Sequence, residues 1–308
     1  LVRYQPPEEG TENGLTIRND TGVFEGGEIS LYYDPMIAKL CTHGPDRITA
    51  IDHMSKALDS FRIDGIQHNI PFLGAIMEHD RFREGALTTA FIAEEYPDGF
   101  HGAPLPDDRA VKLACISIFM NKLHAMRAVQ ITGQLPHRPR KLNDEWVVSL
   151  NEWSRHVKAY DLPGGMLEDG IEIAFLDDDG TETGRHIVKS EWRPGMTVFR
   201  GTVDGEELVV QIARATQGYM LKYRGATAHA VPRTLIGHRL DAHMPELKEA
   251  DTAKMLLCPM PGLVVSIKVE VGQDVLLYPK QVNTVRLIIM HFVKVIKGEN
   301  RSHVLQTV

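Results

Sequence analysis

One long segment, whose apolar residues would cover more than one face of a helix, constrains the fold of this chain more than any other feature. It is expected to form a helix with Asp107 and Asp108 as N-caps and with its end near Thr132. Its apolar positions run from Val111 through Ile118, Met120 and Leu123 to Val129. They cover well over one face of the helix, and a helix of this kind is enclosed by its own domain rather than lying on a surface.

From residue 145 the apolar residues recur at every second position, which is the period of a half-buried strand. The clearest cases are Trp146, Val148 and Leu150, followed by Ile171, Ile173 and Phe175. Turn signals stand at residues 178–180 and 204–205, the second in a hairpin-like setting. Further strands are expected at residues 220–223 and 227–231. Several short strands after one apolar helix predict an antiparallel sheet that curls around the helix.

Residues 1–100 are predicted to mix helices and strands. Strand-like runs occur at residues 28–31 and 36–41. A helix is expected to begin at Pro45, with Asp46 in its first turn, where the helix dipole favours an anion. The apolar face of this helix comprises Ile48, Ile51, Met54, Leu58 and Phe61.

The chain is expected to divide into three parts. Gly65 ends a short strand and residues 72–77 begin a further helical turn, both within the first part. Residues 95–106 are rich in Pro and Gly and suit an inter-domain linker, and the polar residues 245–253 suit a second one. The fold class is therefore multi-domain α+β, with domains at residues 1–100, 101–250 and 251–308.

Composition excludes several classes of function. The chain has 308 residues and a formal net charge of -7, and it contains neither a long apolar run nor a basic stripe. We therefore expect no membrane span and no nucleic-acid partner. Three distant cysteines favour a reducing compartment, and the scattered histidines with no His-Glu-x-x-His pattern give no metal site. Residues 1–7 contain no targeting signal and leave the compartment open.

An ordered set of short motifs resembles the C-terminal part of a biotin carboxylase domain. The set is Arg18, then the run YYDPMIAKL at residues 32–40, then FRIDGI at residues 61–66 and His68-Asn69. The resemblance implies that Arg18 lies beside bicarbonate and the biotin ureido group. A guanidinium suits that place because it stays charged and stabilises the negative charge that develops on the ureido oxygen.

The same resemblance implies that Asp64 holds and orients Arg18 through a charge-assisted pair. A turn residue before Gly65 is the alternative for Asp64, and a surface arginine is the alternative for Arg18. Tyr32, Tyr33 and Asp34 are interpreted as shaping the domain, with Lys39 on the strand. In the family the stretch from residue 32 to residue 47 also lies near a subunit interface.

Much of the family's active site is not recognisable in the sequence. The ATP-grasp portion that binds ATP and Mg²⁺ is expected to lie before Leu1, and no Gly-x-x-x-x-Gly-Lys loop or base for bicarbonate is found. This chain alone is therefore expected not to hydrolyse ATP.

Residues 107–250 resemble the domain that joins the biotin-carrying subunit of propionyl-CoA carboxylase to its carboxyltransferase partner. The resemblance lies in the layout and in phrases such as EWVV at residues 145–148 and SEWRPG at residues 190–195. It implies docking rather than catalysis. Trp153, Trp192 and Arg193 are the docking candidates, since exposed Trp and Arg often anchor interfaces. The alternative is that both tryptophans fill the barrel core.

The sequence CPMPG at residues 258–262, followed by a strand pattern to Val275, resembles the start of a biotin carboxyl carrier domain. By spacing, the biotinyl lysine box should fall near residues 285–289, which read VRLII. Lys254-Met255 precedes the turn and belongs to the linker. The attachment lysine is therefore absent, and the third domain is expected to be a truncated or divergent carrier barrel.

Together these resemblances imply a C-terminal fragment of the biotin-carrying alpha subunit of a biotin-dependent acyl-CoA carboxylase, of the propionyl-CoA type. Such a ligase uses biotin, ATP and Mg²⁺, has a carboxyltransferase beta subunit and its acyl-CoA as partners, and needs a biotin ligase for an intact carrier. The alternatives are the 3-methylcrotonyl-CoA enzyme and a non-catalytic scaffold that binds the beta subunit. The expected location is the cytoplasm in a bacterium, which is favoured, or the mitochondrial matrix in a eukaryote.

Overall fold

The structure is a computed structural model that describes residues 1–29, 32, 36–133, 142–151, 153–166, 168–177 and 179–245. Leu1–His243 form one compact unit. We call residues 1–95 the lobe and residues 107–233 the barrel. The carrier-like segment, the linker at 246–253 and the predicted strand residues 30 and 31 lie outside the described residues.

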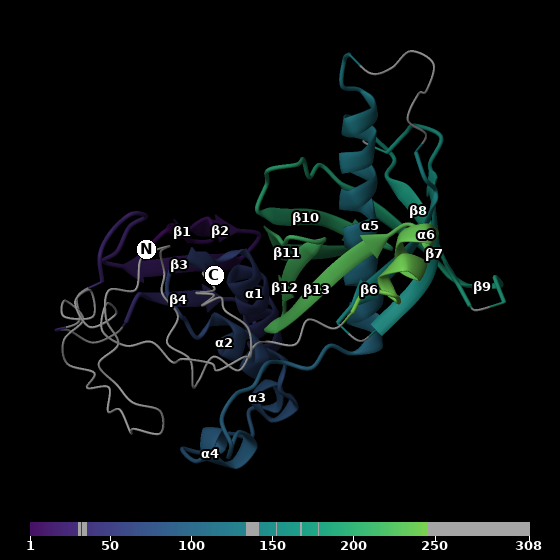
Figure 1. Ribbon diagram of the computed structural model, residues 1–308. Helices are drawn as coiled ribbons and strands as arrows, with labels where there is room; N and C mark the ends of the chain where they lie inside the picture. The colour runs from purple at the N-terminus through teal and green to yellow at the C-terminus, as the bar shows by residue number, and fades with distance from the viewer. Residues whose placement is uncertain are drawn as a thin grey trace, which may run out of the picture. The chain divides into compact units, whose positions relative to one another are not determined.

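The described residues of the lobe form two small antiparallel sheets and four helices (Figure 1). One sheet pairs β1 (Arg3–Gln5) with β5 (Arg62–Asp64), and the other has the order β2 (Gly10–Glu12), β3 (Leu15–Thr21) and β4 (Ala38–His43). The helices are α1 (Arg47–Ser60), α2 (Ile70–Glu78), α3 (Asp80–Glu84) and α4 (Phe91–Glu95). The predicted mixture of helices and strands is confirmed.

The start of α1 differs from the prediction. Asp46 has extended backbone angles and is the N-cap, because its carboxylate accepts a hydrogen bond from the Thr49 N–H at 2.9 Å. The helix therefore begins two residues after Pro45 rather than at it. Of the predicted apolar face, Ile51 is buried whereas Ile48 is 43% exposed. The second strand likewise begins at Ala38 rather than at residue 36.

The long helix α5 (Asp107–Val129) lies where the sequence predicts it. Its N-cap is Pro106, so Asp107 and Asp108 lie in the first turn, where their charge interacts favourably with the helix dipole, and they do not cap it. The helix ends before the predicted Thr132. Every residue from Leu113 to Met120 is 0% exposed, which only a helix surrounded on all sides achieves.

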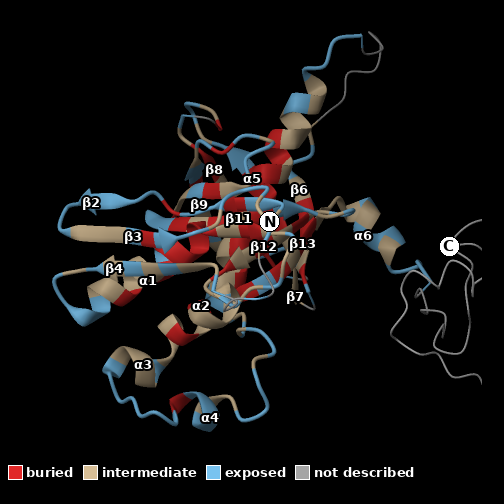
Figure 2. Ribbon diagram, turned by 90° about the vertical axis from the view of Figure 1, so that its left-hand side faces the viewer, coloured by how far each residue is buried: buried red, intermediate tan, exposed pale blue. Residues whose placement is uncertain are grey.

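Eight strands surround α5 as a closed antiparallel barrel (Figure 1). In barrel order they are β10 (Val198–Val203), β11 (Glu206–Arg214), β12 (Tyr219–Tyr223), β13 (Ala226–Arg233), β6 (Glu145–Leu150), β7 (Trp153–Asp161), β8 (Ile171–Leu176) and β9 (Glu182–Ser190). A short helix, α6 (Leu235–Asp241), follows. Figure 2 shows the buried residues gathered along α5 and the strands around it, which confirms the predicted sheet curled around a helix.

Lys122 is a buried charge near the end of the enclosed part of α5. Its side chain is 1% exposed, and its ammonium donates to the Ala159 carbonyl at 3.0 Å and lies 3.1 Å from the Asp161 carboxylate. Asp144 stands 3.7 Å away on the exposed side. These partners satisfy the cation, since a buried charge is tolerated only when it is paired and hydrogen-bonded.

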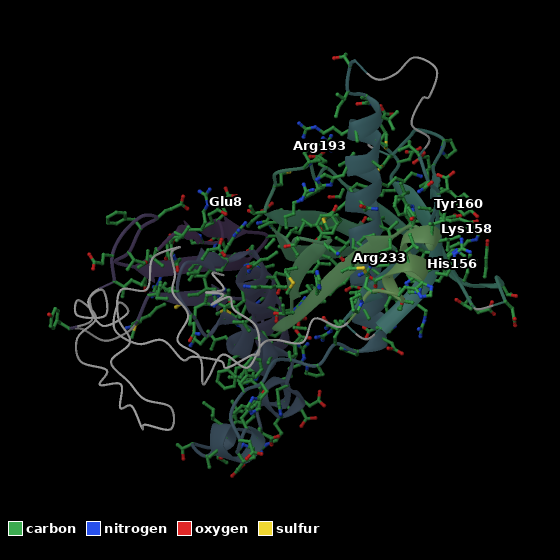
Figure 3. All side chains as sticks on the ribbon, in the orientation of Figure 1. Glu8, His156, Lys158, Tyr160, Arg193 and Arg233 are labelled. Carbon is green, nitrogen blue, oxygen red and sulfur yellow. The ribbon has the colours of Figure 1, made fainter. Side chains whose placement is uncertain are left out.

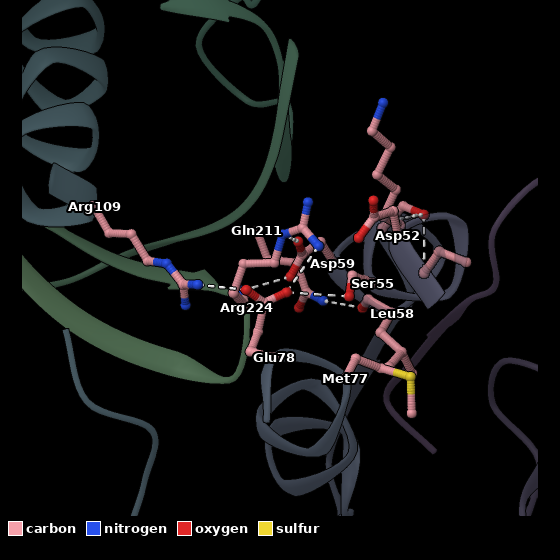
Figure 4. Close-up of polar contacts among 12 residues, drawn as sticks. Asp52, Ser55, Leu58, Asp59, Met77, Glu78, Arg109, Gln211 and Arg224 are labelled. Carbon is pink, nitrogen blue, oxygen red and sulfur yellow. Dashed lines mark hydrogen bonds and ion pairs between the residues drawn. The ribbon is translucent and has the colours of Figure 1, made fainter. Parts of the chain in front are cut away.

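Lobe and barrel meet at a half-buried cluster of charged side chains (Figure 4). Arg224, between β12 and β13, donates from its backbone N–H to Asp59 at 2.8 Å and from its guanidinium to Glu78 at 3.0 Å. Arg109 of α5 also donates to Glu78. The cluster thus joins two helices of the lobe to two elements of the barrel.

The Asp59 carboxyl makes this junction sensitive to pH. Burial raises its pKa to about 7, although the neighbouring Arg224 opposes that shift. Between these two pKa values, 3.8 in the unfolded state and about 7 in the folded state, the folded protein keeps the Asp59 proton that the unfolded protein has released. The stabilisation that the protonated Asp59 gives is therefore fully present below the unfolded-state pKa of 3.8. It is lost as the pH rises from there through the folded-state pKa of about 7.

We expect this loss to disappear in Asp59→Asn, whose amide stays neutral. Between pH 3.8 and about 7, the free energy of unfolding of the wild type minus that of the variant should fall by up to about 1.4 kcal/mol per pH unit. Urea unfolding at a series of pH values measures both proteins. Parallel pH profiles of the two would contradict the raised pKa.

Candidate functional site

The predicted catalytic Arg18 lies on an exposed charged strip across β3 and β4. In the ladder between these strands Arg18 stands opposite Cys41, and Asp20 stands opposite Lys39. These side chains are exposed, while Asn19 between them is buried. The alternation along a strand therefore turns this set of polar groups toward solvent on one face.

Arg18 is held by Asp20. The guanidinium donates to the Asp20 carboxylate at 2.9 Å, and the two side chains are 66% and 52% exposed. Ion pairs that water reaches this freely contribute little, because solvent screens both charges. Asp20 can therefore be exchanged for another anion at low cost, which leaves the Arg18 guanidinium accessible to a negatively charged ligand.

The pair between Arg18 and Asp64 that the resemblance implies is not formed in this structure, where Arg18 donates to Asp20. The Asp64 carboxylate accepts instead from Nε of Arg62 at 2.7 Å, and this arginine is only 15% exposed. Asp64 lies on β5, which pairs with β1, whereas Arg18 lies in the other sheet of the lobe. Arg62 and Asp64 are two residues apart on one strand and so share a face, which makes them the closer partners.

A groove of about 730 Å³ lies beside the charged strip, between β4 and the helices α1 and α2. Lys39 belongs to both features, since it stands opposite Asp20 and also lines the groove. The other polar groups on its wall are Gln67, His68 and Asn69, and burial lowers the pKa of His68. The apolar lining residues are Met36, Ile37, Ala38, Leu40, Met54, Leu58, Phe61, Ile63, Ile70, Leu73 and Met77.

Of the three docking candidates, Trp192 is part of the barrel core. It is 3% exposed, and its indole N–H donates to the Met196 carbonyl at 3.0 Å. A side chain enclosed in this way offers no surface to a partner, so the core alternative that the sequence left open describes it.

Trp153 and Arg193 are more accessible. Trp153 is half-buried, with the Arg155 guanidinium 5.0 Å from its ring centre. Arg193 is exposed in the loop between β9 and β10, and its guanidinium donates to the Glu191 carbonyl at 3.0 Å (Figure 3). Of the three candidates, these two have side chains that reach the surface.

Lys39, Asp20 and Cys41 are the residues near Arg18 that sequence reasoning missed as its neighbours. Strand alternation alone places Asp20 on the same face as Arg18. The β4 residues are different, because the long connection between the two strands leaves the register open until the structure pairs them.

Two further features concern cofactors and thiols. Among the side chains that the structure describes, no group of three His, Cys, Asp or Glu residues is arranged to hold a metal ion. Cys41 and Cys115 are both free, and burial raises the pKa of the Cys115 thiol well above its ordinary value. Within the same described residues no helix is long and apolar enough to cross a membrane.

Comparison with known protein families matches both halves of the compact unit. The family described as the biotin carboxylase C-terminal domain matches residues 1–94. The family described as the propionyl-coenzyme A carboxylase BT domain matches residues 113–247. The first match contains the strip with Arg18, and the second contains most of α5 and the whole barrel.

Relatives match along the same residues. The propionyl-CoA carboxylase alpha chain of Ruegeria pomeroyi is 42% identical over 89% of this chain and 41% of its own length. The methylcrotonoyl-CoA carboxylase subunit alpha of Dictyostelium discoideum is 38% identical over only 35% of this chain and 16% of its own length. The chain thus spans about two fifths of the first of these relatives.

Among solved structures, the biotin carboxylase domain of the Hydrogenobacter thermophilus 2-oxoglutarate carboxylase, in complex with ADP and bicarbonate, is 38% identical. It covers 31% of this chain and 20% of its own, with a TM-score of 0.27.

Proposed function

We propose that this homologue of the propionyl-CoA carboxylase alpha chains works as part of the biotin-carrying subunit of such an enzyme. The enzyme is a ligase that carboxylates biotin with ATP and bicarbonate and delivers the carboxyl group to a carboxyltransferase beta subunit. The observation that carries the proposal is that two family matches, in order, coincide with the lobe and the barrel of one compact unit.

In this proposal the lobe contributes Arg18 to biotin carboxylation. Biotin, when bound, would accept the carboxyl group of bicarbonate after ATP, bound with Mg²⁺, has activated it. The Arg18 guanidinium stabilises negative charge on the ureido oxygen, which its solvent exposure and weakly held Asp20 partner permit. Asp20, rather than Asp64, is the residue that positions Arg18 before a ligand arrives.

The barrel contributes docking to the beta subunit. Trp153 and Arg193 are proposed as contact residues, since both reach the surface of the barrel. We further propose three domains, at residues 1–100, 101–250 and 251–308. The third would be a partial carrier barrel, and an intact carrier would be loaded by a biotin ligase. The proposed compartment is the cytoplasm or the mitochondrial matrix.

The test of the function uses a complete alpha subunit that contains this chain, together with a beta subunit. We expect ATP-dependent transfer of labelled bicarbonate to propionyl-CoA, and slower transfer to 3-methylcrotonyl-CoA. Formation of the complex without any carboxylation would favour the scaffold alternative. Faster use of the branched substrate would favour the 3-methylcrotonyl-CoA enzyme.

Docking has its own expected result. Arg193→Glu should weaken co-elution of the chain with the beta subunit on a sizing column by at least about tenfold in apparent affinity, because a charge reversal at an interface replaces attraction by repulsion. The matched control is Arg239→Glu on α6, which makes the same charge change at another exposed position. Equal co-elution of both variants and the wild type would exclude Arg193 from the interface.

A further inference from the structure

We propose that the turn between β12 and β13 is a joint that locks the lobe to the barrel, so that the Arg18 strip and the docking barrel move as one rigid body. The proposal goes beyond carboxylation and docking themselves, since it concerns how the two are held in register. It rests on backbone geometry and on the polar contacts at the turn.

The turn has a backbone that suits close approach. Tyr223 pairs with Ala226, so Arg224 and Gly225 form a two-residue hairpin turn. Their φ angles are +50° and +78°, the left-handed values that the commonest tight hairpin turn requires at both positions. Arg224 carries a side chain at such a φ, which directs a long charged group outward from the tip of the hairpin.

The tip presses directly on the backbone of α2. A Cβ atom added to Gly225 would lie 2.4 Å from the Pro71 carbonyl oxygen and 2.8 Å from the Ala75 nitrogen. A Cβ added to Gly74 would lie 2.8 Å from the Gly225 nitrogen. No side chain fits at either position without separating the two backbones, so glycine on both sides permits this contact.

The Arg224 side chain then binds both helices of the lobe. Its Nε lies 3.3 Å from the Asp59 carboxylate of α1, and its terminal nitrogen donates to Glu78 of α2 at 3.0 Å. The Asp59 side chain is 8% exposed and that of Arg224 15%. Charges so poorly hydrated depend on each other, and removal of Arg224 takes away the cation that faces the buried Asp59 carboxyl.

Two neighbouring contacts extend the joint along the barrel. The Gln211 amide of β11 donates to the Leu58 and Phe61 carbonyls, at 3.3 Å and 2.9 Å, where α1 ends. The Leu58 carbonyl also accepts from the N–H of Phe61, the C-cap residue, at 3.2 Å, since the last turn of a helix leaves its acceptors open to partners beyond it. The barrel thereby caps α1 while Arg109 of α5 holds Glu78 of α2.

A further ion pair between lobe and barrel, outside the charged cluster, differs in kind. Lys56 lies 3.3 Å from Glu207, but the two side chains are 47% and 77% exposed. Water screens such a pair, so it is not expected to hold the lobe in place. It provides a control at the same interface.

The experiment measures the distance between spin labels on the full chain. One label is placed on the native Cys41 of β4 and the other on Ile187→Cys of β9, with Cys258→Ser, so that the one unlabelled cysteine left is the buried Cys115. Both labelled positions are exposed. For the wild-type joint, pulsed electron paramagnetic resonance should give one narrow distribution of distances between the two spin labels.

Two variants open the joint in different ways. Gly74→Val inserts a side chain between the backbones, and Arg224→Ala removes the buried guanidinium. Each should broaden the distribution and abolish the single narrow peak, whereas Lys56→Ala should leave it unchanged. Near-ultraviolet circular dichroism verifies that each variant remains folded, and Arg224→Ala decides alone if Gly74→Val does not fold.

A broad distribution in the wild type, or narrow peaks in folded variants, would overturn the proposal. None of these measurements requires carboxylase activity or a beta subunit. A failure of the joint is therefore distinguishable from a failure of the proposed function.

Discussion

Arg18→Ala is expected to lower biotin carboxylation by about 10²–10³-fold in a complete subunit that contains this chain. The variant lacks the only charge proposed here to stabilise the ureido oxygen, and water in its place must reorganise as charge develops. The side chain is 66% exposed and has the exposed Asp20 as its partner, so its removal should leave the fold intact. Labelled bicarbonate and free biotin measure the partial reaction directly.

Two matched variants separate catalysis from structure. Arg18→Lys keeps a charge but loses the planar fork of donors, so its rate should lie between those of the wild type and the alanine variant. Asp64→Asn should affect stability more than rate, because Asp64 pairs with Arg62 rather than with Arg18. Unchanged carboxylation in Arg18→Ala would remove Arg18 from the reaction. A large loss in Asp64→Asn, without unfolding, would restore the role that the resemblance implied.

Phe119→Ala is expected to lower the free energy of unfolding by about 3–5 kcal/mol. Phe119 is 0% exposed at the centre of α5, and its ring meets the Phe199 ring edge-on with 6.0 Å between centroids. The barrel is closed by hydrogen bonds all the way round. Its strands are therefore poorly able to move inward, and most of the cavity should remain empty.

Urea unfolding compares Phe119→Ala with Ile187→Ala on the outer side of β9. Ile187 is 38% exposed, so its truncation should cost less than about 1 kcal/mol. Equal losses in the two variants would mean that α5 is not enclosed as described.

The enclosed helix and most of the barrel strands could be predicted from local patterns. An apolar surface on all sides of the middle of α5 leaves a helix no stable place except an interior. Among the strands, β12 buries alternate residues, and β6, β8 and β13 each bury at least half of theirs. β9 escaped prediction because Val188 is the one residue of that strand that is buried. A strand with so few buried residues shows no apolar alternation that would distinguish its sequence from that of a loop.

The partners of the charged residues depend on the tertiary structure and could not be predicted from local patterns. Arg18 and Asp64 are recognisable in sequence, but the pairing of β3 with β4 and of β5 with β1 places them in separate sheets. Nothing in the sequence distinguishes Lys122 from a surface lysine. Only the folded barrel places the Ala159 carbonyl and the Asp161 carboxylate next to its ammonium group. Neither outcome is written in the spacing of residues along the chain.

Periodicity reports which faces of an element avoid water, and the amino-acid sequence alone was enough to place a helix inside a sheet. Partnership between charges depends on which surfaces meet and on how much water remains between them. Asp59 and Arg224 are 165 positions apart. Only the packing of a hairpin tip against α2 brings them together and excludes solvent, and that close approach turns two ordinary surface residues into a buried junction.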